Sequence, residues 1–297
     1  MKQENKKEKI EDEILKIETE MSQSDFWSDK QNAQDKIKRL EELKEQKKGV
    51  GKYDKGDSVL TIFSGAGGDD SEDFSKMLFG MYTKFIENNG WGYRIIHSNE
   101  NNHGGFRNIT IEINGKNSYG TLKNESGVHR LVRISPFNAN GKRQTSFSMV
   151  EVVPEIPKIS DIDIKEDELS IDFTKSSGPG GQNVNKRETT VRIVHIPTKI
   201  SVHVDSERSQ EQNKQKALEI LGGKLYHLRE EERKKKEQGL SVSKTTENEW
   251  GSQIRSYVLH PYKMVKDHRT GIEIRDTEDV LNGGIDKFIE AEKNLLY

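Results

Sequence analysis

A glycine-rich stretch from Lys175 to Arg187 holds the residues whose types and spacing point most directly to chemistry. It reads K-S-S-G-P-G-G-Q-N-V-N-K-R, so neither a buried strand nor a stable helix is expected there. Gly180 and Gly181 lack a Cβ and let the backbone come very close to another molecule. Gln182 follows with a backbone N–H and a side-chain amide, and both form hydrogen bonds. The stretch therefore predicts a functional loop with Gln182 at its tip.

The loop has two other possible interpretations, a phosphate-binding loop and an exposed loop without function. A phosphate-binding loop needs G-x-x-x-x-G-K-[ST] before a helix, whereas a strand-like run follows here, which argues against nucleotide binding. An exposed loop without function is compatible with the composition alone. The loop contains no nucleophile–base pair and no metal-ligand cluster, so we expect neither a metal nor a cofactor. His195 and His203 lie in strand-like runs, where a structural or surface role is the simpler interpretation.

The stretch from Ser176 to Asn185 resembles the Gly-Gly-Gln loop of the class I peptide chain release factors. A second motif, Gly127-Val128-His129-Arg130 followed by Ser135-Pro136-Phe137, resembles the stop-codon reader of the bacterial release factor 2 branch of that family. A third stretch, Trp250 to Tyr257, is similar to the family's C-terminal region. The motifs occur in the family's order, and together they cover most of residues 57–291.

The resemblance implies a protein that reads the stop codons UAA and UGA in the ribosomal A site and triggers hydrolysis of the peptidyl-tRNA ester. This hydrolysis depends on the ribosome, so the chain is not expected to be a stand-alone enzyme. Gly180, Gly181 and Gln182 would carry the catalysis, in which the Gln182 N–H stabilises the oxyanion and water is oriented beside the ester. In the family this glutamine is modified to N5-methylglutamine, so Gln182 implies a glutamine methyltransferase as a partner.

The resemblance also implies a set of codon-binding residues. The Ser135 hydroxyl both donates and accepts hydrogen bonds, so it accommodates either purine at the second codon position. Phe137 would shape the pocket. The other codon-binding positions are Pro136 in the motif, Gly67 and Asp70 for the first uridine, Val132 and Thr145 for the third base, and Gln144 as a stacking platform.

Three features depart from the family pattern. Gln144 stands where the family commonly has a histidine that stacks on a base, and an amide plane stacks less well than an aromatic ring. Asp70 stands where the family usually has glutamate, which is one methylene longer. Only about fifty residues precede Asp57, where the family has a longer helical bundle. We therefore expect an abbreviated N-terminal domain, and contacts with the recycling GTPase are not implied.

Charge is distributed unevenly although the formal net charge is −2. Residues 155–172 carry seven acids and two lysines, whereas residues 175–238 carry fourteen bases and nine acids. A local basic surface attracts phosphate, although a solvated chain with clustered charges is the alternative. The expected RNA-backbone contacts are Lys186, Arg187 and Arg192. The expected partners are the ribosomal RNA of the decoding and peptidyl-transferase centres, the mRNA stop codon and the P-site peptidyl-tRNA.

The composition favours a cytoplasmic protein. The chain has 297 residues, no cysteine and 33% charged residues, and its mean hydropathy is −0.91. Without cysteine it has no disulfide framework or thiolate metal site, which suits a reducing compartment. The N-terminus lacks an apolar signal segment, and no run approaches the ~20 apolar residues of a membrane span. We therefore expect no membrane partner.

The elements that position these motifs predict an α+β, multidomain fold. Residues 1–49 indicate a helical hairpin with apolar residues on both inner faces. The expected strands are 59–63, 92–97, 106–113, 128–134, 145–153, 169–173, 190–196 and 200–204, and the main helices are 70–88 and 209–238. The predicted domains are an N-terminal helical domain (1–52), an antiparallel-sheet codon-recognition domain (53–157), an inserted α/β Gly-Gly-Gln domain (158–248) and a C-terminal segment packing on the codon-recognition domain (249–297).

Two other functions remain open from the sequence. Pro179 to Lys186 also resembles the small ribosome-rescue hydrolases, which act independently of a codon. Those proteins generally lack the Ser-Pro-Phe domain and end in a basic tail, whereas this chain has the motif and ends in F-I-E-A-E-K-N-L-L-Y. The second alternative is a non-hydrolytic RNA-binding module, in which the loop only docks.

Overall fold

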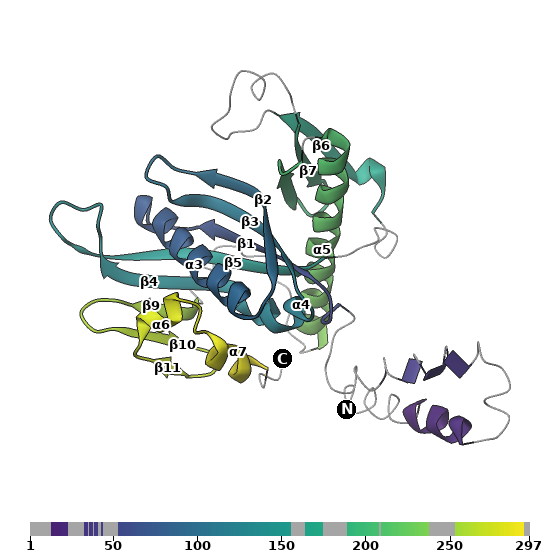
Figure 1. Cartoon of the computed structure of the whole chain (residues 1–297). Helices are drawn as coiled ribbons and strands as arrows, with labels where there is room; N and C mark the ends of the chain where they lie inside the picture. The colour runs from purple at the N-terminus through teal and green to yellow at the C-terminus, as the bar shows by residue number, and fades with distance from the viewer. Residues whose placement is uncertain are drawn as a thin grey trace. The chain divides into compact units, whose positions relative to one another are not determined.

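The structure is a computed structural model of the whole chain (Figure 1). The residues it describes are 13–22, 33–34, 36–37, 39–40, 43, 53–155, 164–174, 189–207, 209–237 and 253–293. The chain divides into two compact units, residues 1–55 and 56–297. The predicted catalytic loop, residues 175–187, lies outside the described residues.

The first unit contains a helix over residues 13–21 and helical residues between 33 and 43. Ile17, Leu40 and Leu43 are buried against one another, and Ile14 and Met21 pack beside them. These are residues whose spacing predicts the inner faces of a helical hairpin. The described part of this unit agrees with that prediction.

The second unit is built around an eight-stranded sheet in the order β11-β10-β9-β4-β5-β1-β3-β2 (Figure 1). Its strands are β1 (Ser58–Ser64), β2 (Gly92–Glu100), β3 (Phe106–Asn114), β4 (Gly127–Ile134), β5 (Arg143–Pro154), β9 (Gln253–Val258), β10 (Met264–Asp267) and β11 (Glu273–Ile274). The pairs among β1 to β5 are antiparallel, as predicted. Strand β9 adds parallel to β4, which the sequence did not predict. A parallel pair needs a long crossover, and here the crossover includes the second sheet and its helix.

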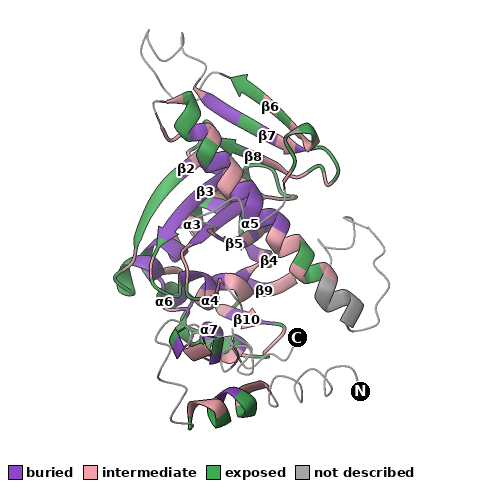
Figure 2. Ribbon diagram, turned by 90° about the vertical axis from the view of Figure 1, so that its right-hand side faces the viewer, coloured by how far each residue is buried: buried purple, intermediate pink, exposed green. Residues whose placement is uncertain are grey.

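Helix α3 (Asp69–Asn88) covers one face of this sheet and packs against β1, β3 and β5. Phe74, Leu78 and Met81 recur at helical spacing and are fully buried, and β1 contributes the fully buried Leu60 and Ile62 (Figure 2). Helix α4 (Ser118–Leu122) and the short helix η2 (Lys123–Glu125) then connect β3 to β4. Burial of α3 against the sheet places the start of the helix at one end of the strands.

A smaller antiparallel sheet follows in the order β6-β7-β8. Its strands are β6 (Leu169–Thr174), β7 (Thr190–His195) and β8 (Ser201–Val204), preceded by η4 (Glu166–Glu168). Helix α5 (Gln210–Glu237) packs on β7 and β8. Their buried apolar side chains are Val191, Ile193, Val202 and Val204 from the strands and Ala217, Ile220, Leu221 and Leu225 from the helix. The predicted strands and helix are present within about two residues of their predicted ends.

The two sheets share one hydrophobic cluster. Val59, Ile96 and Val153 of the larger sheet are buried together with the apolar residues of the smaller sheet and α5. Helix α5 approaches β5 closely at Gly223, where a Cβ would overlap the carbonyl oxygen of Pro154. Because this packing runs across the predicted boundary near residue 157, the division into separate domains there stays a prediction.

Lysines of α5 form ion pairs with the larger sheet beside this contact. Lys216 Nζ lies 2.9 Å from Glu112 Oε2 and 2.5 Å from Glu155 Oε1. Lys224 Nζ lies 2.5 Å from Glu151 Oε2. Both lysine side chains are about one-tenth exposed, so solvent screens these pairs less than surface pairs. Together with the glycine contact, they fix α5 against β5.

The C-terminal segment is fixed to the larger sheet by a buried ion cluster. Arg255 of β9 is fully buried, and its Nη2 lies 2.6 Å from Glu125 Oε1, 2.5 Å from Glu292 Oε1 and 3.3 Å from Asp267 Oδ2. Arg269 Nη2 lies 2.8 Å from Asp267 Oδ2 and 2.6 Å from Glu292 Oε1. Glu292 is the last residue of helix α7 (Asp286–Glu292), which follows α6 (Thr277–Leu281). The cluster therefore joins η2, β9, β10 and α7.

Two guanidinium groups in this cluster face three carboxyl groups, so the acidic groups outnumber the basic ones. Burial opposes ionisation of Glu125, but the charge and hydrogen bonds of Arg255 lower its pKa to about 2. Burial and the nearby Glu125 charge raise the pKa of Glu292 to about 9. Its Oε2 is buried without a hydrogen-bond partner among the described residues. Glu292 therefore holds its proton to a higher pH than an ordinary glutamate.

A side chain at Gly223 should weaken the contact between α5 and β5. We expect Gly223→Ala to lower the free energy of unfolding by about 1–3 kcal/mol, because the backbone of Pro154 must move. Gly80→Ala is the matched control, since Gly80 lies in α3 with open space around its Cβ position. That variant should be neutral or stabilised by about 0.5–1 kcal/mol. Urea unfolding measures both, and equal stability of the two variants would contradict the close approach.

The raised pKa of Glu292 makes stability depend on pH. A carboxyl whose folded pKa lies above its unfolded value stabilises the fold below the unfolded pKa, near ~4.3, and this contribution is lost as pH rises toward about 9. Glu292→Gln keeps a neutral acceptor, so its stability should decline less between pH 5 and pH 9 than that of the wild type. Glu290→Gln, exposed on the same helix, should leave the profile unchanged. Parallel profiles for wild type and Glu292→Gln would show that Glu292 is ionised in the folded chain.

Candidate functional site

The predicted codon-binding residues gather at one end of the larger sheet. Gly67 precedes α3, Ser135 and Phe137 lie in the connection from β4 to β5, and both connections lie at the left of Figure 1. In the β4–β5 pair, Val132 lies opposite Thr145 and Arg133 lies opposite Gln144. Pro136, Phe137, Gln144 and Thr145 are exposed. Residues that are far apart in the sequence thus form one surface.

Ser135 is the buried centre of this surface, with only 3% of its area exposed. Its hydroxyl donates to Asp70 Oδ2 at 2.6 Å, and its Oγ accepts from the Phe137 N–H at 3.1 Å. The Ser135 N–H donates to the carbonyl oxygen of Lys142 at 3.1 Å. A hydroxyl has one proton, so contact with a purine that needs a donor requires the Ser135 proton to leave Asp70.

Arg133 holds Asp70 in place and was not predicted as a site residue. Its Nη2 lies 3.1 Å from Asp70 Oδ1 and 2.7 Å from Asp73 Oδ2. Such charge-assisted hydrogen bonds are stronger than neutral ones. Two sequence signals mark this contact: Ser135 follows the end of a strand two positions after Arg133, the spacing of side chains on one face, and the two acids are three apart at a helix start.

The turn before α3 is fixed to β5 by backbone hydrogen bonds. The Gly65 N–H donates to the Phe147 carbonyl at 2.8 Å, and the Phe147 N–H donates to the Ala66 carbonyl at 3.1 Å. Gly67 has φ 139°, and a Cβ there would lie 3.1 Å from Ser146 Oγ. Only glycine adopts this backbone without strain, so the close approach of the turn to β5 depends on Gly67.

Phe137 presents an aromatic face at the rim of the site. Its side chain is 41% exposed, and its ring centroid lies 5.8 Å from that of His103 at an interplanar angle of 48°. His103 lies in the turn between β2 and β3 and was not predicted as a site residue. The sequence gives no signal for this contact, since the turn is 34 positions away from Phe137 in the chain.

The predicted catalytic loop begins and ends on neighbouring strands. Gly180, Gly181, Gln182, Lys186 and Arg187 are outside the described residues. In the described flanks, Thr174 pairs with Thr190 at the adjoining ends of β6 and β7. Arg192 is exposed on β7, opposite Asp172. The smaller sheet therefore supplies two paired strands as the base of the loop.

The histidines of the smaller sheet have structural contacts. His195 Nδ1 lies 2.8 Å from Thr198 Oγ1, and His195 Nε2 lies 3.5 Å from Glu168 Oε2. The His203 ring stacks on His97, with centroids 5.6 Å apart, where β8 faces the larger sheet. Burial and the neighbouring His97 lower the pKa of His203.

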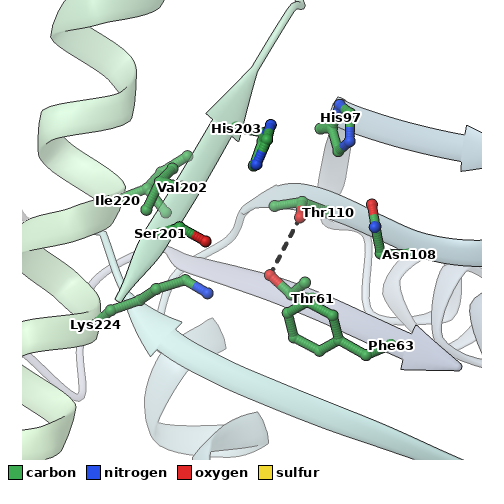
Figure 3. A pocket seen from close by; sticks show the side chains of 10 residues that line it. All are labelled: Thr61, Phe63, His97, Asn108, Thr110, Ser201, Val202, His203, Ile220 and Lys224. Carbon is green, nitrogen blue, oxygen red and sulfur yellow. Dashed lines mark hydrogen bonds between the residues drawn. The ribbon is translucent and has the colours of Figure 1, made fainter. Parts of the chain in front are cut away.

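A pocket of about 150 Å³ lies at this junction between the sheets (Figure 3). Phe63, Asn108 and Lys224 line it together with the two stacked histidines, and the Lys224 ammonium is paired with Glu151.

Among the described residues, no three His, Cys, Asp or Glu side chains are arranged to hold a metal ion. No helix among the described residues is both long enough and apolar enough to cross a bilayer.

Comparisons with known proteins identify two matching family profiles. The PCRF domain matches residues 49–150, and the RF-1 domain matches residues 157–269. Peptide chain release factor 2 of Petrotoga mobilis is 41% identical over 96% of this chain and 91% of its own length. Peptide chain release factor 2 of Thermotoga petrophila is 50% identical over 82% of this chain, and the match spans 66% of that relative. The solved structure of release factor 2 from Thermus thermophilus has a TM-score of 0.72 and 40% identity, covering 95% of this chain and 80% of that chain.

The hydrogen bonds of Ser135 can be tested in the free protein, without RNA or ribosomes. In Ser135→Ala the Phe137 N–H loses its acceptor, so we expect faster hydrogen exchange at this amide. The free energy of unfolding should fall by about 1–3 kcal/mol, because a buried hydrogen bond to a charged group is lost. Asn138→Ala is the control in the same connection, since Asn138 Oδ1 accepts from the Asn140 N–H and not from Phe137. Unchanged exchange at Phe137 in Ser135→Ala would rule out the hydrogen bond.

Proposed function

Because the chain belongs to the family of bacterial class I peptide chain release factors, we propose that it is a translation termination factor. It reads UAA and UGA in the ribosomal A site and triggers hydrolysis of the ester between the finished peptide and its tRNA. The observation that carries the proposal is the surface at the end of the larger sheet, where Ser135 is held between Asp70 and Phe137. Its partners are the ribosome, the mRNA stop codon and the P-site peptidyl-tRNA, and its place of action is the cytoplasm.

Codon reading follows from the hydrogen-bonding capacity of this surface. The Ser135 hydroxyl accepts from adenine or, after rotating away from Asp70, donates to guanine, which explains tolerance of both purines at the second position. Asp70 and the turn at Gly67 meet the first uridine. Thr145, which lies opposite Val132 in the β4–β5 pair, contacts the third base. The exposed Pro136, Phe137 and Gln144 form the rest of the codon-binding surface.

The charged residues beside Ser135, Arg133 and Asp70, give this surface its selectivity for uridine over cytosine. Arg133 holds the Asp70 carboxyl group in one orientation, so Asp70 offers a fixed acceptor to the N–H of uridine. A cytosine presents an acceptor at that edge, and two acceptors facing each other are repelled. When no codon is bound, the Ser135 hydroxyl donates to Asp70 again. Arg133 therefore acts as a positioning residue rather than as a contact to the codon.

Hydrolysis is assigned to Gly180, Gly181 and Gln182. The two glycines allow close approach to the ester, and the Gln182 N–H stabilises the oxyanion that forms when water attacks. The Gln182 side chain excludes other nucleophiles, and the terminal ribose hydroxyl of the tRNA and the ribosome supply the remaining groups. A glutamine methyltransferase modifies Gln182 to N5-methylglutamine. Lys186, Arg187 and Arg192 neutralise the RNA backbone.

The experiment that tests this function is release of labelled formyl-methionine from ribosomes with different A-site codons. We expect release on UAA and UGA, and none on UAG, on a sense codon or with an empty A site. Release that is indifferent to the codon would instead indicate a ribosome-rescue hydrolase. Binding to the ribosome without release on any codon would indicate a docking module.

Two variants of Gln182 test whether its backbone N–H is the group that hydrolysis requires. Gln182→Pro removes the N–H that stabilises the oxyanion, so we expect the release rate to fall by about 10²–10³-fold. Gln182→Ala keeps the N–H and should retain much more activity toward water. Both variants should bind UAA-programmed ribosomes as the wild type does, because codon binding lies on the other sheet. Equal rates for the two variants would exclude the backbone N–H as the oxyanion donor.

A further inference from the structure

A second pocket lies beside the proposed codon surface and has no role in the mechanism above. Its volume is about 210 Å³, and it opens between the start of α3 and the turn joining β2 to β3. The lining residues are Asp69, Glu100, Asn101, Asn102, His103 and Arg107. The His103 ring reaches from this pocket to Phe137 of the codon surface, with the ring centroids 5.8 Å apart. We call it the His103 pocket.

The turn that carries His103 is held in one position. Asn101 Oδ1 accepts from the N–H of His103 at 2.9 Å and from the N–H of Gly105 at 2.7 Å. The Asn101 N–H donates to the Gly105 carbonyl at 2.8 Å. Gly105 packs so closely on α3 that a Cβ would lie 2.8 Å from the carbonyl carbon of Glu72. The pocket is therefore preorganised against the first turn of α3.

The groups in the pocket match a flat heteroaromatic ligand with donors and acceptors on its edge. His103 is exposed and offers an aromatic face for stacking. The carboxylates of Asp69 and Glu100 accept hydrogen bonds. Asn101 Nδ2 is buried without a partner among the described residues, so a donor remains to be satisfied. Arg107, held by Glu72 through its Nε at 3.2 Å, has further N–H groups to donate.

The charge of the pocket selects between the parts of a nucleotide. Two carboxylates, Asp69 and Glu100, repel a phosphate, whereas they accept hydrogen bonds from the N–H groups of a base. The pocket thus favours a base edge over the RNA backbone. The volume of about 210 Å³ is smaller than the ~300–1,000 Å³ of pockets for drug-sized ligands, which suits a single flat ring system.

We propose that the His103 pocket binds one unpaired nucleobase of RNA, with the His103 ring as its stacking face. The inference rests on the proposed function, because RNA is brought to this edge of the sheet only when Ser135 and Phe137 meet a codon. Gln144 is not aromatic, and His103 supplies an aromatic face next to Phe137. In the mRNA, the nucleotide after the stop codon is the available one, since the nucleotide before it is paired to the P-site tRNA. An unpaired base of ribosomal RNA is the other source.

The test measures the concentration of factor that gives half-maximal release on UAA, with wild type, His103→Ala and His103→Phe. Stacking of a base on an aromatic side chain predicts that His103→Ala raises this concentration by about tenfold. His103→Phe retains an aromatic face and should restore most of the affinity. Tyr93→Ala is the matched control, an exposed aromatic residue at the opposite end of the same strand pair. Its half-maximal concentration should equal that of the wild type.

A second mRNA, with an abasic nucleotide after UAA, distinguishes the source of the base. If the loss from His103→Ala disappears on this mRNA, the base belongs to the mRNA. If the loss is the same on both mRNAs and His103→Phe restores affinity, the base belongs to ribosomal RNA. The proposal would be overturned if His103→Ala did not lower the affinity, or if His103→Phe failed to restore the affinity lost in His103→Ala. Codon-dependent release by the wild type in the same assay separates this failure from failure of the proposed function.

Discussion

The burial of the Arg255 charge is the constraint on which the codon surface depends. A buried guanidinium requires acidic partners, and here these come from η2, β10 and α7, so the C-terminal segment can dock only with all of them in place. Docking puts β9 beside β4, with Arg255 opposite His129. Strand β4 is then an interior strand, paired with β5 along its whole length and with β9 as far as Val132, just before Arg133 and Ser135. Loss of the C-terminal segment would leave β4 at an edge and the codon surface without support.

The shared hydrophobic cluster connects the proposed codon surface physically with the sheet that carries the proposed catalytic loop. Helix α5 covers the smaller sheet with one side and meets β5 at Gly223 with another. Strand β5 begins at Arg143, next to Gln144 and Thr145, and ends at Pro154 beside α5. One strand thus touches the codon surface at one end and the helix of the loop-bearing sheet at the other. A change in the position of α5 therefore acts on the same strand that carries part of the proposed codon surface.

Local patterns in the sequence predicted most of the elements and some of the site. Alternation and helical spacing located β1 to β8, α3 and α5, whereas Gly67, which has a positive φ in the structure, was singled out by the family resemblance. Contacts between distant residues were not predictable in this way. Arg255 and Glu125 are 130 positions apart, and nothing in their neighbourhoods marks them as a buried pair. The parallel addition of β9 and the approach of His103 to Phe137 also arise from tertiary packing, which single-sequence periodicity does not encode. The predicted roles of Gln182 and of the codon-binding residues stay predictions.

The most direct measurement is a structure, by electron cryo-microscopy, of the chain bound to a ribosome with UAA in the A site and a tRNA in the P site. We expect Ser135 and Phe137 to contact the second base of the codon, with the Ser135 hydroxyl released from Asp70 or accepting from the base. We expect the Gln182 N–H to lie within hydrogen-bond distance of the ester position at the 3′ end of the tRNA. A complex in which this end of the larger sheet faces away from the codon, or in which Gln182 lies remote from the tRNA end, would contradict the assignment of codon reading and hydrolysis to these two regions.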